Sequence, residues 1–580
     1  MSSSVVQQGY DSNIHRALAI PELLSIVCSY STTAENARNA LVSRQWNSVA
    51  LDHIWKEVDN LYYILRILVP MHSRNDHPFA FTRPPTQQDW TRFAPYARRV
   101  RSIRYQPRSD HQPRSEYHHI LDDSVFQDLA RTRTSLAVFP NLRLLWWEEF
   151  DTRAHQLVFM HEGITEFHVL LQPLAPQSVM MEGYFADVTA RMPALQTLCL
   201  LCPLGDGGYI PTAAFQTLVA GAQKLKRIKL PKDSLNGATL KELAKLPHLG
   251  AIEFDTDGGL KSDNTPTIQK TLAPTDFPAL WDLCLNSDLA DMRTFLVGGA
   301  LLPNLKCLFV DSLNAEKAST VHDLLVDIAA SYPDLEMFAM DVVVPMHEQL
   351  ASETLTLSHI RPLLSLKSLK SLELRHNFPL DLTEEDVAEL AQALPKLENL
   401  VLNPEPLELC KPTLDLQVLL TLARHCPALQ KVSIYLNADA TSALSLPSTS
   451  TSRLFPALHT LVFGVSPIAA EHVPISLFLS HLVSDNAVLK IEYGLTWSDE
   501  LYQADDVYAQ FASVRYDRWA EVAKTVPLLL ELRKQERRER RNIEREVEDL
   551  RMRNEVLMER AKLTSKSSLS AQLEKGCVMC

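Results

Sequence analysis

The chain has 580 residues, of which 22% are charged, and a formal net charge of −13. This acidic balance argues against a general nucleic-acid binder, which would carry a basic face. No apolar run approaches the ~18 to 20 residues that cross a bilayer, and residues 1–11 are polar, without the pattern of a signal peptide. We therefore expect a cytoplasmic or nuclear protein whose length reflects several domains or an array of repeats.

After residues 1–15, which we expect to be disordered, the sequence predicts a small helical unit at residues 16–58. Its first helix carries Pro21 in the first turn, where the missing N–H group costs no hydrogen bond. A polar turn separates it from a second helix at Ala40–Ala50, and Leu51–Trp55 closes the unit. About 40 residues are near the limit for a self-sufficient core, so apolar residues left on the faces of this unit indicate a partner.

This unit resembles an F-box, whose pattern is Leu-Pro-x-Glu-Leu-Leu-x-x-Ile, then a Val-Cys-Arg-x-Trp helix, then a final Trp. Here Ile20 replaces the first Leu, and Ser43–Trp46 stands in for the Cys-Arg-x-Trp stretch. The resemblance implies a helical hairpin that docks on the Skp-type adaptor of cullin-based ubiquitin ligases. The alternative is a hairpin that only caps the first repeat. Carried over by position, the adaptor-binding residues are Pro21, Leu23, Leu24, Ile26, Leu41, Val42 and Trp46.

Residues 59–94 are expected to form a connecting helix and loop, and a repeated phrase then occupies residues 95–495. The phrase is an apolar residue and Pro followed by Leu-x-x-Leu-x-Leu, as in Met192–Leu200. Strand alternation turns positions one, four and six of the phrase inward and positions three, five and seven outward. The proline ends the preceding helix because it has no N–H group to donate. The first positions are Val100, Leu142, Ile164, Leu195, Leu225, Leu249, Leu280, Leu305, Leu335, Leu369, Leu397, Leu429, Leu458 and Val488.

The phrase resembles the leucine-rich repeat family, and the whole chain resembles fungal-type F-box proteins with C-terminal leucine-rich repeats. The resemblance implies an α/β fold with a small all-α F-box hairpin, an irregular solenoid whose strands line the concave side, and a C-terminal helix. The repeats here are 22 to 42 residues apart, rather than ~20 to 29, and the Asn that commonly follows the strand is mostly missing. The alternative is an ordinary α/β domain with parallel strands.

Outward strand positions are where a solenoid of this kind would select its partner. Stacked strands lie about 4.8 Å apart, so acids at outward positions of neighbouring repeats would form one acidic stripe around an aromatic residue. We expect this stripe to receive a basic segment of a client protein. The alternative is a solvated face of an acidic protein. The stripe consists of Glu253, Asp255, Asp282, Phe309, Asp311 and Asp341.

The sequence offers no motif for catalysis or for a cofactor. Cys199 and Cys202 form a C-x-x-C, but no second Cys or His pair lies nearby at zinc spacing. The loop Gly205–Gly208 lacks the Lys-Ser/Thr of a phosphate-binding loop, and no G-x-S-x-G or H-E-x-x-H motif occurs. The sequence therefore predicts a protein without an active site, a metal or a cofactor.

The composition changes after Pro527. Residues 496–527 are expected to cap the repeats, and the charged residues 528–563 predict a lone charged helix or a short coiled coil. Asn554 at an a position of the coiled coil favours parallel dimers, so a homodimer through residues 543–561 is expected. The positions that alternate four and three residues apart are Ile543, Val547, Leu550, Asn554, Leu557 and Ala561.

The last four residues, Cys577–Cys580, resemble a CaaX box on a flexible tail at residues 564–580. The resemblance implies prenylation of Cys577 and contact of the tail with a membrane. Cys580 as the last residue departs from the usual preferences of prenyltransferases. A single prenyl chain binds membranes only marginally, so a second signal would be required.

Taken together, these resemblances imply a non-catalytic substrate-recognition subunit of a Skp-cullin-F-box ubiquitin ligase. Its partners would be the Skp-type adaptor, the cullin and a client protein. One alternative is a leucine-rich-repeat scaffold outside ubiquitination that is prenylated and tethered to a membrane. Another is an F-box protein that acts with the adaptor alone.

Overall fold

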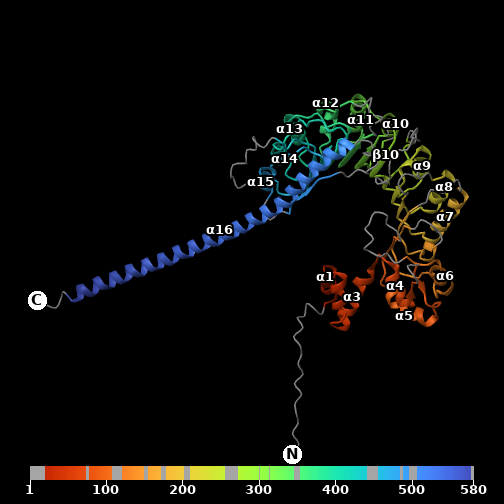
Figure 1. The fold of residues 1–580 in the computed structure, drawn as a ribbon, viewed down its shortest axis with the longest axis horizontal. Coiled ribbons are helices and arrows are strands. Elements are labelled where there is room, and N and C mark those ends of the chain that lie inside the picture. Colours follow the sequence, from red (N-terminus) through yellow and green to blue (C-terminus); the bar gives the residue numbers. More distant parts are fainter. Residues whose placement is uncertain are drawn as a thin grey trace, which may run out of the picture. The chain divides into compact units, whose positions relative to one another are not determined.

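The computed structural model describes residues 20–73, 78–106, 120–148, 155–170, 178–201, 210–254, 272–299, 301–312, 314–344, 353–439, 455–483, 488–494 and 506–575. The chain divides into two compact units. The first unit comprises Met1–Asn314 with Ala330–Leu335, and the second comprises Ala315–Ala329 with Glu336–Cys580. Figure 1 colours the chain along the sequence from red to blue, and each unit is described by itself below.

The described part of the first unit begins with a hairpin of short helices: α1 (Pro21–Ser29), α2 (Thr33–Asn39) and α3 (Arg44–Lys56). The sequence predicts only a polar turn where α2 lies, and this prediction is wrong. The side chain of Thr32 accepts a hydrogen bond from the N–H group of Glu35, whose carboxylate accepts one from the N–H group of Thr32. This capping box starts a helix within the polar stretch.

The second predicted helix of the hairpin, Ala40–Ala50, begins later than the sequence indicates. The Ser43 side chain accepts a hydrogen bond from the N–H group of Trp46 and so caps α3, which then continues without a break to Lys56. Leu41 and Val42 therefore lie in the turn between α2 and α3 and not on a helix.

Apart from one short antiparallel pair, the described strands of the first unit are parallel, and each pairs with the next of these strands along the chain. Helices alternate with the strands, and α7 packs against α8 and α8 against α9. The strands are β1 (Glu57–Val58), β4 (Ser102–Tyr105), β5 (Leu144–Trp147), β6 (Glu166–Leu170), β7 (Thr197–Leu201), β8 (Arg227–Leu230), β9 (Ala251–Phe254), β10 (Asp282–Asn286) and β11 (Cys307–Asp311). The helices are α4 (Leu61–Leu68), α5 (Gln87–Ala97), α6 (Asp123–Thr132), α7 (Ser178–Arg191), α8 (Thr212–Gly221), α9 (Gly237–Leu243) and α10 (Leu289–Val297), with 3-10 turns η2 (His155–Val158) and η3 (Lys232–Ser234). An antiparallel pair, β2 (Met71–His72) and β3 (Ala80–Phe81), lies before α5.

Burial follows the phases of the repeated phrase. In the repeat that contains β5, Leu142, Leu145 and Trp147 are buried, whereas Trp146 is half-buried on the other face of the strand. The prediction for positions one, four and six is confirmed in the earlier repeats, but it is wrong in the last one, where Val488 and Tyr493 are exposed and Leu489 is buried instead. Position seven differs, because Asn286 and Asp311, which are register partners at the ends of β10 and β11, are both buried.

In the second unit the described strands are again parallel, and successive strands pair in order. The strands are β12 (Met337–Asp341), β13 (Ser371–Arg375), β14 (Asn399–Leu402), β15 (Lys431–Ile434), β16 (Thr460–Val462) and β17 (Lys490–Glu492). The helices that accompany them are α12 (Leu357–Ile360), α13 (Glu384–Ala393), α14 (Val418–His425), α15 (Val473–Leu482) and α16 (Asp506–Lys575), with the 3-10 turn η5 (Arg361–Ser365). Helix α11 (Ala318–Ser331) begins in this unit.

Buried amides follow two strands of the second unit, although the sequence shows few residues in the usual place of the repeat Asn. Asn377 donates to the carbonyl of Val344 at 2.8 Å and accepts from its N–H group at 2.8 Å. Asn403 bonds His376 in the same two ways, and its φ of 45° is one that Asn tolerates better than most residues. These side chains pair backbone groups that the strands leave unmatched as they end.

Helix α16 is one continuous helix, whereas the sequence predicts a boundary at residue 527 and a flexible tail from residue 564. Its first part packs on the second unit, where Trp519 is fully buried. The Trp519 ring stacks on Phe463 with centroids 4.2 Å apart, and its Nε1 donates to the carbonyl of Ser466 at 2.9 Å. Arg533 donates to the carbonyl of Ser480 at 2.6 Å and closes this packed part.

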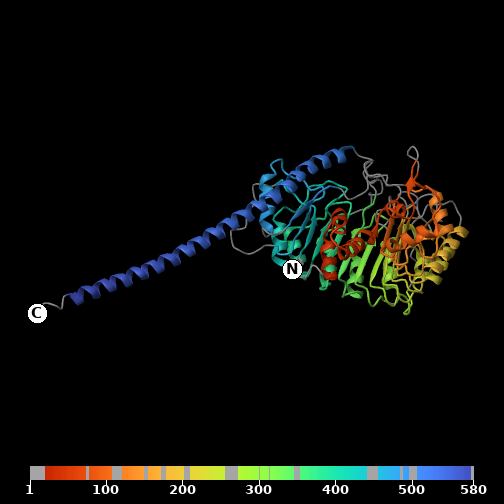
Figure 2. The ribbon, with the colours of Figure 1, turned by 90° about the horizontal axis from the view of Figure 1, so that it is seen from below.

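Beyond Lys534 the same helix is exposed at every position up to residue 563 (Figures 1 and 2). The helix continues past residue 564 to Lys575, the last described residue, and the sequence has no Pro or Gly between Pro527 and Gly576 that would interrupt it. Cys577 lies outside the described residues. Within the described part of the chain, no helix is both long enough and apolar enough to span a membrane.

Candidate binding surfaces

The hairpin α1–α3 is held together by a small core and by buried polar contacts. Cys28, Ala40 and Ala50 form the core, and Leu24 is fully buried. The buried Asn36 donates to the carbonyl of Cys28 at 2.9 Å and thereby joins α2 to the end of α1. The side chains in this core are mostly small, so larger apolar residues of the hairpin remain outside it.

One face of α1 carries a continuous apolar stripe that is open to solvent. Leu23, Ile26, Val27 and Tyr30 recur at positions i, i+3, i+4 and i+7, which share one side of a helix, and all are exposed. Ile20 extends this α1 stripe by one turn. An apolar stripe of this kind on an exposed helix indicates a contact surface.

The turn before α3 adds a second exposed apolar group. Leu41 is 86% exposed, and Val42 beside it is also exposed. The side chain of Asn47 donates to the carbonyl of Ala40 at 2.8 Å, and the N–H group of Leu41 donates to the carbonyl of Arg38 at 3.0 Å. The turn pair, Leu41 and Val42, is therefore presented on an ordered backbone.

The predicted adaptor-binding residues fall into different environments. Pro21, Leu23 and Ile26 are exposed on α1, as the turn pair is after α2. Leu24 is buried and Trp46 is half-buried, so these two support the hairpin more than they present a surface. Val27 and Tyr30 were missed, although their spacing from Leu23 places them on the exposed stripe.

A second surface lies on the strands of the first unit, where outward residues stand in register. Trp146, His168, Cys199, Lys229 and Glu253 are successive register partners from β5 to β9. The rings of Trp146 and His168 stack with centroids 4.5 Å apart and planes 15° apart. This register agrees with the position-five residues that the repeat phrase predicts.

These register partners, from Trp146 to Glu253, form a strand ladder. Its Trp146 end is both aromatic and charged. The guanidinium carbon of Arg104 lies 4.7 Å from the centre of the Trp146 ring, within the range of a cation–π contact. The His168 Nε2 atom lies 2.7 Å from a carboxylate oxygen of Glu166, and Trp146 Nε1 donates to Glu148. Sequence reasoning placed the site elsewhere on the strands, although the adjacent Trp and His at position five could have indicated this end.

The predicted acidic stripe is largely neutralised by basic neighbours. Glu253 pairs with Arg227, and the carboxylate of Asp311, only 2% exposed as a residue, lies 2.9 Å from the ammonium group of Lys232. Asp311 is therefore an interior ion pair and not an exposed acid, so the prediction for this residue is wrong. The pairing could not be read from the sequence, because Lys232 lies in η3, outside the repeat phrase.

Asp282 is the acid of this group whose charge is least favourable. Burial, reinforced by the charge of Glu253, raises its pKa to about 6, although Arg227 acts in the opposite direction. Phe309 packs on Phe254 with ring centroids 5.3 Å apart.

The other two members of the predicted stripe are Asp341 and Asp255. Asp341 belongs to the second unit, where it accepts a hydrogen bond from the N–H group of Val343 at 3.0 Å. Asp255 lies outside the described residues. Within the first unit, Glu253, Asp282, Phe309 and Asp311 lie on the neighbouring strands β9, β10 and β11.

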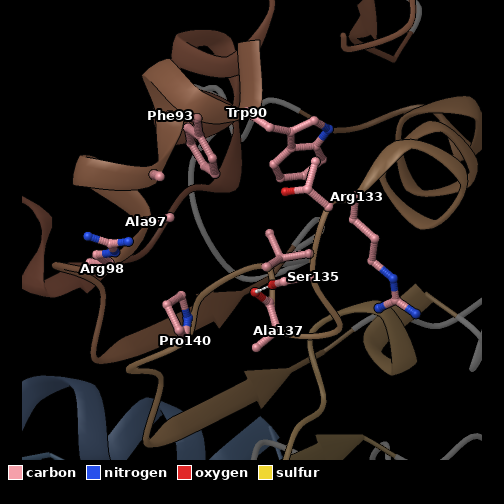
Figure 3. A pocket seen from close by; sticks show the side chains of 11 residues that line it. Trp90, Phe93, Ala97, Arg98, Arg133, Ser135, Ala137 and Pro140 are labelled. Atoms are coloured by element: carbon pink, nitrogen blue, oxygen red, sulfur yellow. Dashed lines mark hydrogen bonds between the residues drawn. The ribbon is translucent and has the colours of Figure 1, made fainter. Parts of the chain in front are cut away.

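A small cavity of about 190 Å³ lies between α5 and the segment at residues 133–140 (Figure 3). Trp90 and Phe93 line one wall, and Arg98 and Arg133 lie on opposite sides. Arg133 is already engaged, since it donates to the carbonyls of Leu136 and Val158. The cavity is smaller than the ~300 to 1,000 Å³ of most ligand sites, and no chemistry is assigned to it.

Burial disfavours the thiolate at three of the described cysteines, and it raises the pKa of Cys28 among them. Burial raises the pKa of the Cys426 thiol to about 11, and burial, with the nearby carboxylates, raises the pKa of Cys284 further still. Cys199 is buried in β7, and Cys202 lies outside the described residues. Among the described side chains, no group of three or more potential ligands could hold a metal ion.

No family model matches the chain, and no curated protein matches it. Among solved structures, the chain is similar to one from the complex of Rad7 and Elc1 in yeast, at 12% identity and a TM-score of 0.35, over 77% of this chain and 92% of that one. It is also similar to the leucine-rich repeat-containing protein LegL7 from Legionella pneumophila, at 15% identity and a TM-score of 0.31, over 58% of this chain and 97% of that one. The parallel strands, their register and the periodic burial described above are consistent with a solenoid-like fold of the leucine-rich-repeat kind.

Proposed function

We propose that this protein is the substrate-recognition subunit of a Skp-cullin-F-box ubiquitin ligase. The hairpin α1–α3 would bind the Skp-type adaptor, and the adaptor would connect it to the cullin. The outward strand positions would bind the client. The chain itself would be a non-catalytic receptor, because the enzymes recruited to the complex would perform the ubiquitin chemistry.

The observation that carries the proposal is the exposed apolar surface of the hairpin. A cap that only closed the solenoid would bury its large apolar residues against the first repeat. Here Leu23 is 41% exposed and Leu41 is 86% exposed, while small residues fill the core. This distribution supports a hairpin that is completed by a partner, at the positions where the F-box resemblance places adaptor contacts.

The client would bind to the strand ladder of the first unit. Trp146 and His168 offer a half-buried aromatic surface with Arg104 beside it. Tyrosine, tryptophan and arginine side chains are enriched among residues that dominate binding energy at protein interfaces. The paired acids Glu253 and Asp311 are poorer contacts, because a basic client segment would have to compete with Arg227 and Lys232.

Adaptor binding tests the proposal directly. The chain would be co-expressed with a Skp-type adaptor and purified through a tag on the adaptor. The informative variant is Leu23→Ser with Leu41→Ser, because both side chains are exposed and their loss leaves the hairpin core intact. The matched control is Leu136→Ser, since Leu136 is 79% exposed on another part of the first unit.

We expect the wild type and the Leu136 variant to co-purify with the adaptor. The double variant is expected not to co-purify with it. If a folded wild type is not captured, the chain is a repeat scaffold of another class. If the adaptor is captured but cullin never co-purifies from cell extracts, the protein acts with the adaptor alone. Equal capture of all three forms would place the adaptor contact outside the hairpin.

A further inference from the structure

The exposed half of α16 carries apolar residues that no other part of the described chain covers. Ile543, Val547, Leu550 and Leu557 are all exposed, with Leu550 at 55%. They recur four and three residues apart, which is the period of a coiled-coil seam. A helix that stood alone in water would gain nothing from this pattern, because its apolar stripe would remain solvated.

The packed half of the helix leaves room for a partner along this seam. Leu530 is the last buried residue of α16, and the seam begins at Ile543, about 20 Å further along at 1.5 Å per residue. The seam therefore starts beyond the part of α16 that packs on the repeats of the second unit. Upstream, Arg540 would occupy a seam position, and it instead pairs with Glu544 on its own helix at 3.2 Å.

The charges beside the seam select the partner. With Val547 and Asn554 at a positions, Glu546 falls at g and Arg551 at the following e. In a parallel, in-register pair of identical helices, each g residue faces the next e residue of the other helix. Neither Glu546 nor Arg551 has an ion-pair partner within the described chain, so each is available for this contact.

We propose that the exposed part of α16 binds a second copy of this chain as a parallel, in-register, two-stranded coiled coil through residues 543–561. Two Glu546–Arg551 pairs flank the seam, one on each side. Asn554 meets its counterpart at an a position, where an amide pair favours two parallel strands over other arrangements. The dimer is independent of the proposed ligase function, and if both hold, it presents two client-binding faces in one complex.

The mass of the full chain in solution tests the proposal. Light scattering coupled to size exclusion, over a concentration series, is expected to give twice the chain mass of 65.4 kDa. Leu550→Lys with Leu557→Lys is expected to weaken the dimer about a hundredfold, since each leucine contributes roughly tenfold. The matched control is Met552→Lys, because Met552 is 62% exposed on the opposite face of the helix and should leave the mass unchanged.

A charge exchange tests the register and the orientation. Glu546→Arg or Arg551→Glu alone places like charges across both pairs and is expected to weaken self-association about tenfold. Mixing these two variants restores opposite charges in the heterodimer, which should form about as well as the wild type. Circular dichroism would verify that each variant keeps its helix content.

Four results would overturn the proposal. A monomer at every concentration would leave the helix unpaired, and a trimer would contradict the two-stranded arrangement. A dimer that survives the two lysines would place the interface elsewhere. Failure of the mixed charge variants to associate would exclude the parallel register. Failure of the chain to capture the adaptor would not change the mass or the self-association measured here. The dimer proposal and the ligase proposal can therefore be rejected independently.

Discussion

The hairpin α1–α3 and the repeats use large apolar side chains in opposite ways. In the repeats, the leucines that define the phrase are buried, as Leu142 and Leu145 are in the repeat that contains β5. In the hairpin, the core is built mainly from small residues, while Leu23 and Leu41 face solvent. Apolar residues therefore specify the fold in one region and indicate a partner in the other. Neighbouring residues with opposite burial allow this difference to be measured.

The largest effect is expected in the repeats, at Trp147. Its ring is buried between Tyr105, with centroids 4.4 Å apart, and Phe159, with centroids 5.7 Å apart. Trp147→Ala would leave a large cavity, and we expect it to lower the free energy of unfolding of the first unit by about 3–5 kcal/mol. Equilibrium denaturation followed by circular dichroism would measure the shift.

The neighbouring Trp146 is the control for this change, because the strand turns it to the other face. Trp146→Ala removes the stack on His168, the contact with Arg104 and the hydrogen bond to Glu148 but leaves no interior cavity, so we expect a loss of about 1 kcal/mol. Equal losses for the two tryptophans would contradict the assignment of inward and outward faces.

A smaller effect is expected in the hairpin, where Leu24 and Leu23 form the equivalent pair. Leu24→Ala removes a fully buried side chain from α1 and should destabilise the hairpin by about 2 kcal/mol. Leu23→Ala should stay within about 0.5 kcal/mol, because Leu23 is exposed and lies outside the small core of the hairpin. Hydrogen exchange of the α1 amides reports the difference locally. Fast exchange in both variants would show that Leu23 also belongs to the core.

The sequence predicts the strands well because their pattern is periodic and long. A shift of one residue would turn every leucine of a strand to solvent, so the phrase determines the register as well as the strand. Position seven is harder, because Asp311 is buried by Lys232, a contact between segments far apart in the chain. The pairing depends on the position of η3, which follows β8, relative to the end of β11. The pattern of the repeat does not encode this position.

The hairpin shows a signal that was present but not used. Thr32 and Glu35 have the spacing of a capping box, which marks the start of α2 within an otherwise polar stretch. At the other end of the chain, α16 continues through Pro527 because Val526 and Leu530 beside it are buried on the second unit. Tertiary packing there overrides the local preference of proline to end a helix.

The smallest effect is expected at Asp282, whose ionised carboxylate is disfavoured by its surroundings in the repeats. Its pKa is raised from 3.8 to about 6 in the folded chain, chiefly by burial and then by Glu253. The folded state therefore binds the proton more tightly than the unfolded state does, and stability falls as the pH rises from about 4 to about 6. Asp282→Asn removes this loss, so we expect a slightly higher melting temperature than wild type at pH 7.5 and no difference at pH 4. Because the charge of Arg227 partly offsets the penalty, a lower melting temperature for the variant at pH 7.5 would mean that the attraction between Arg227 and Asp282 outweighs the cost of burial.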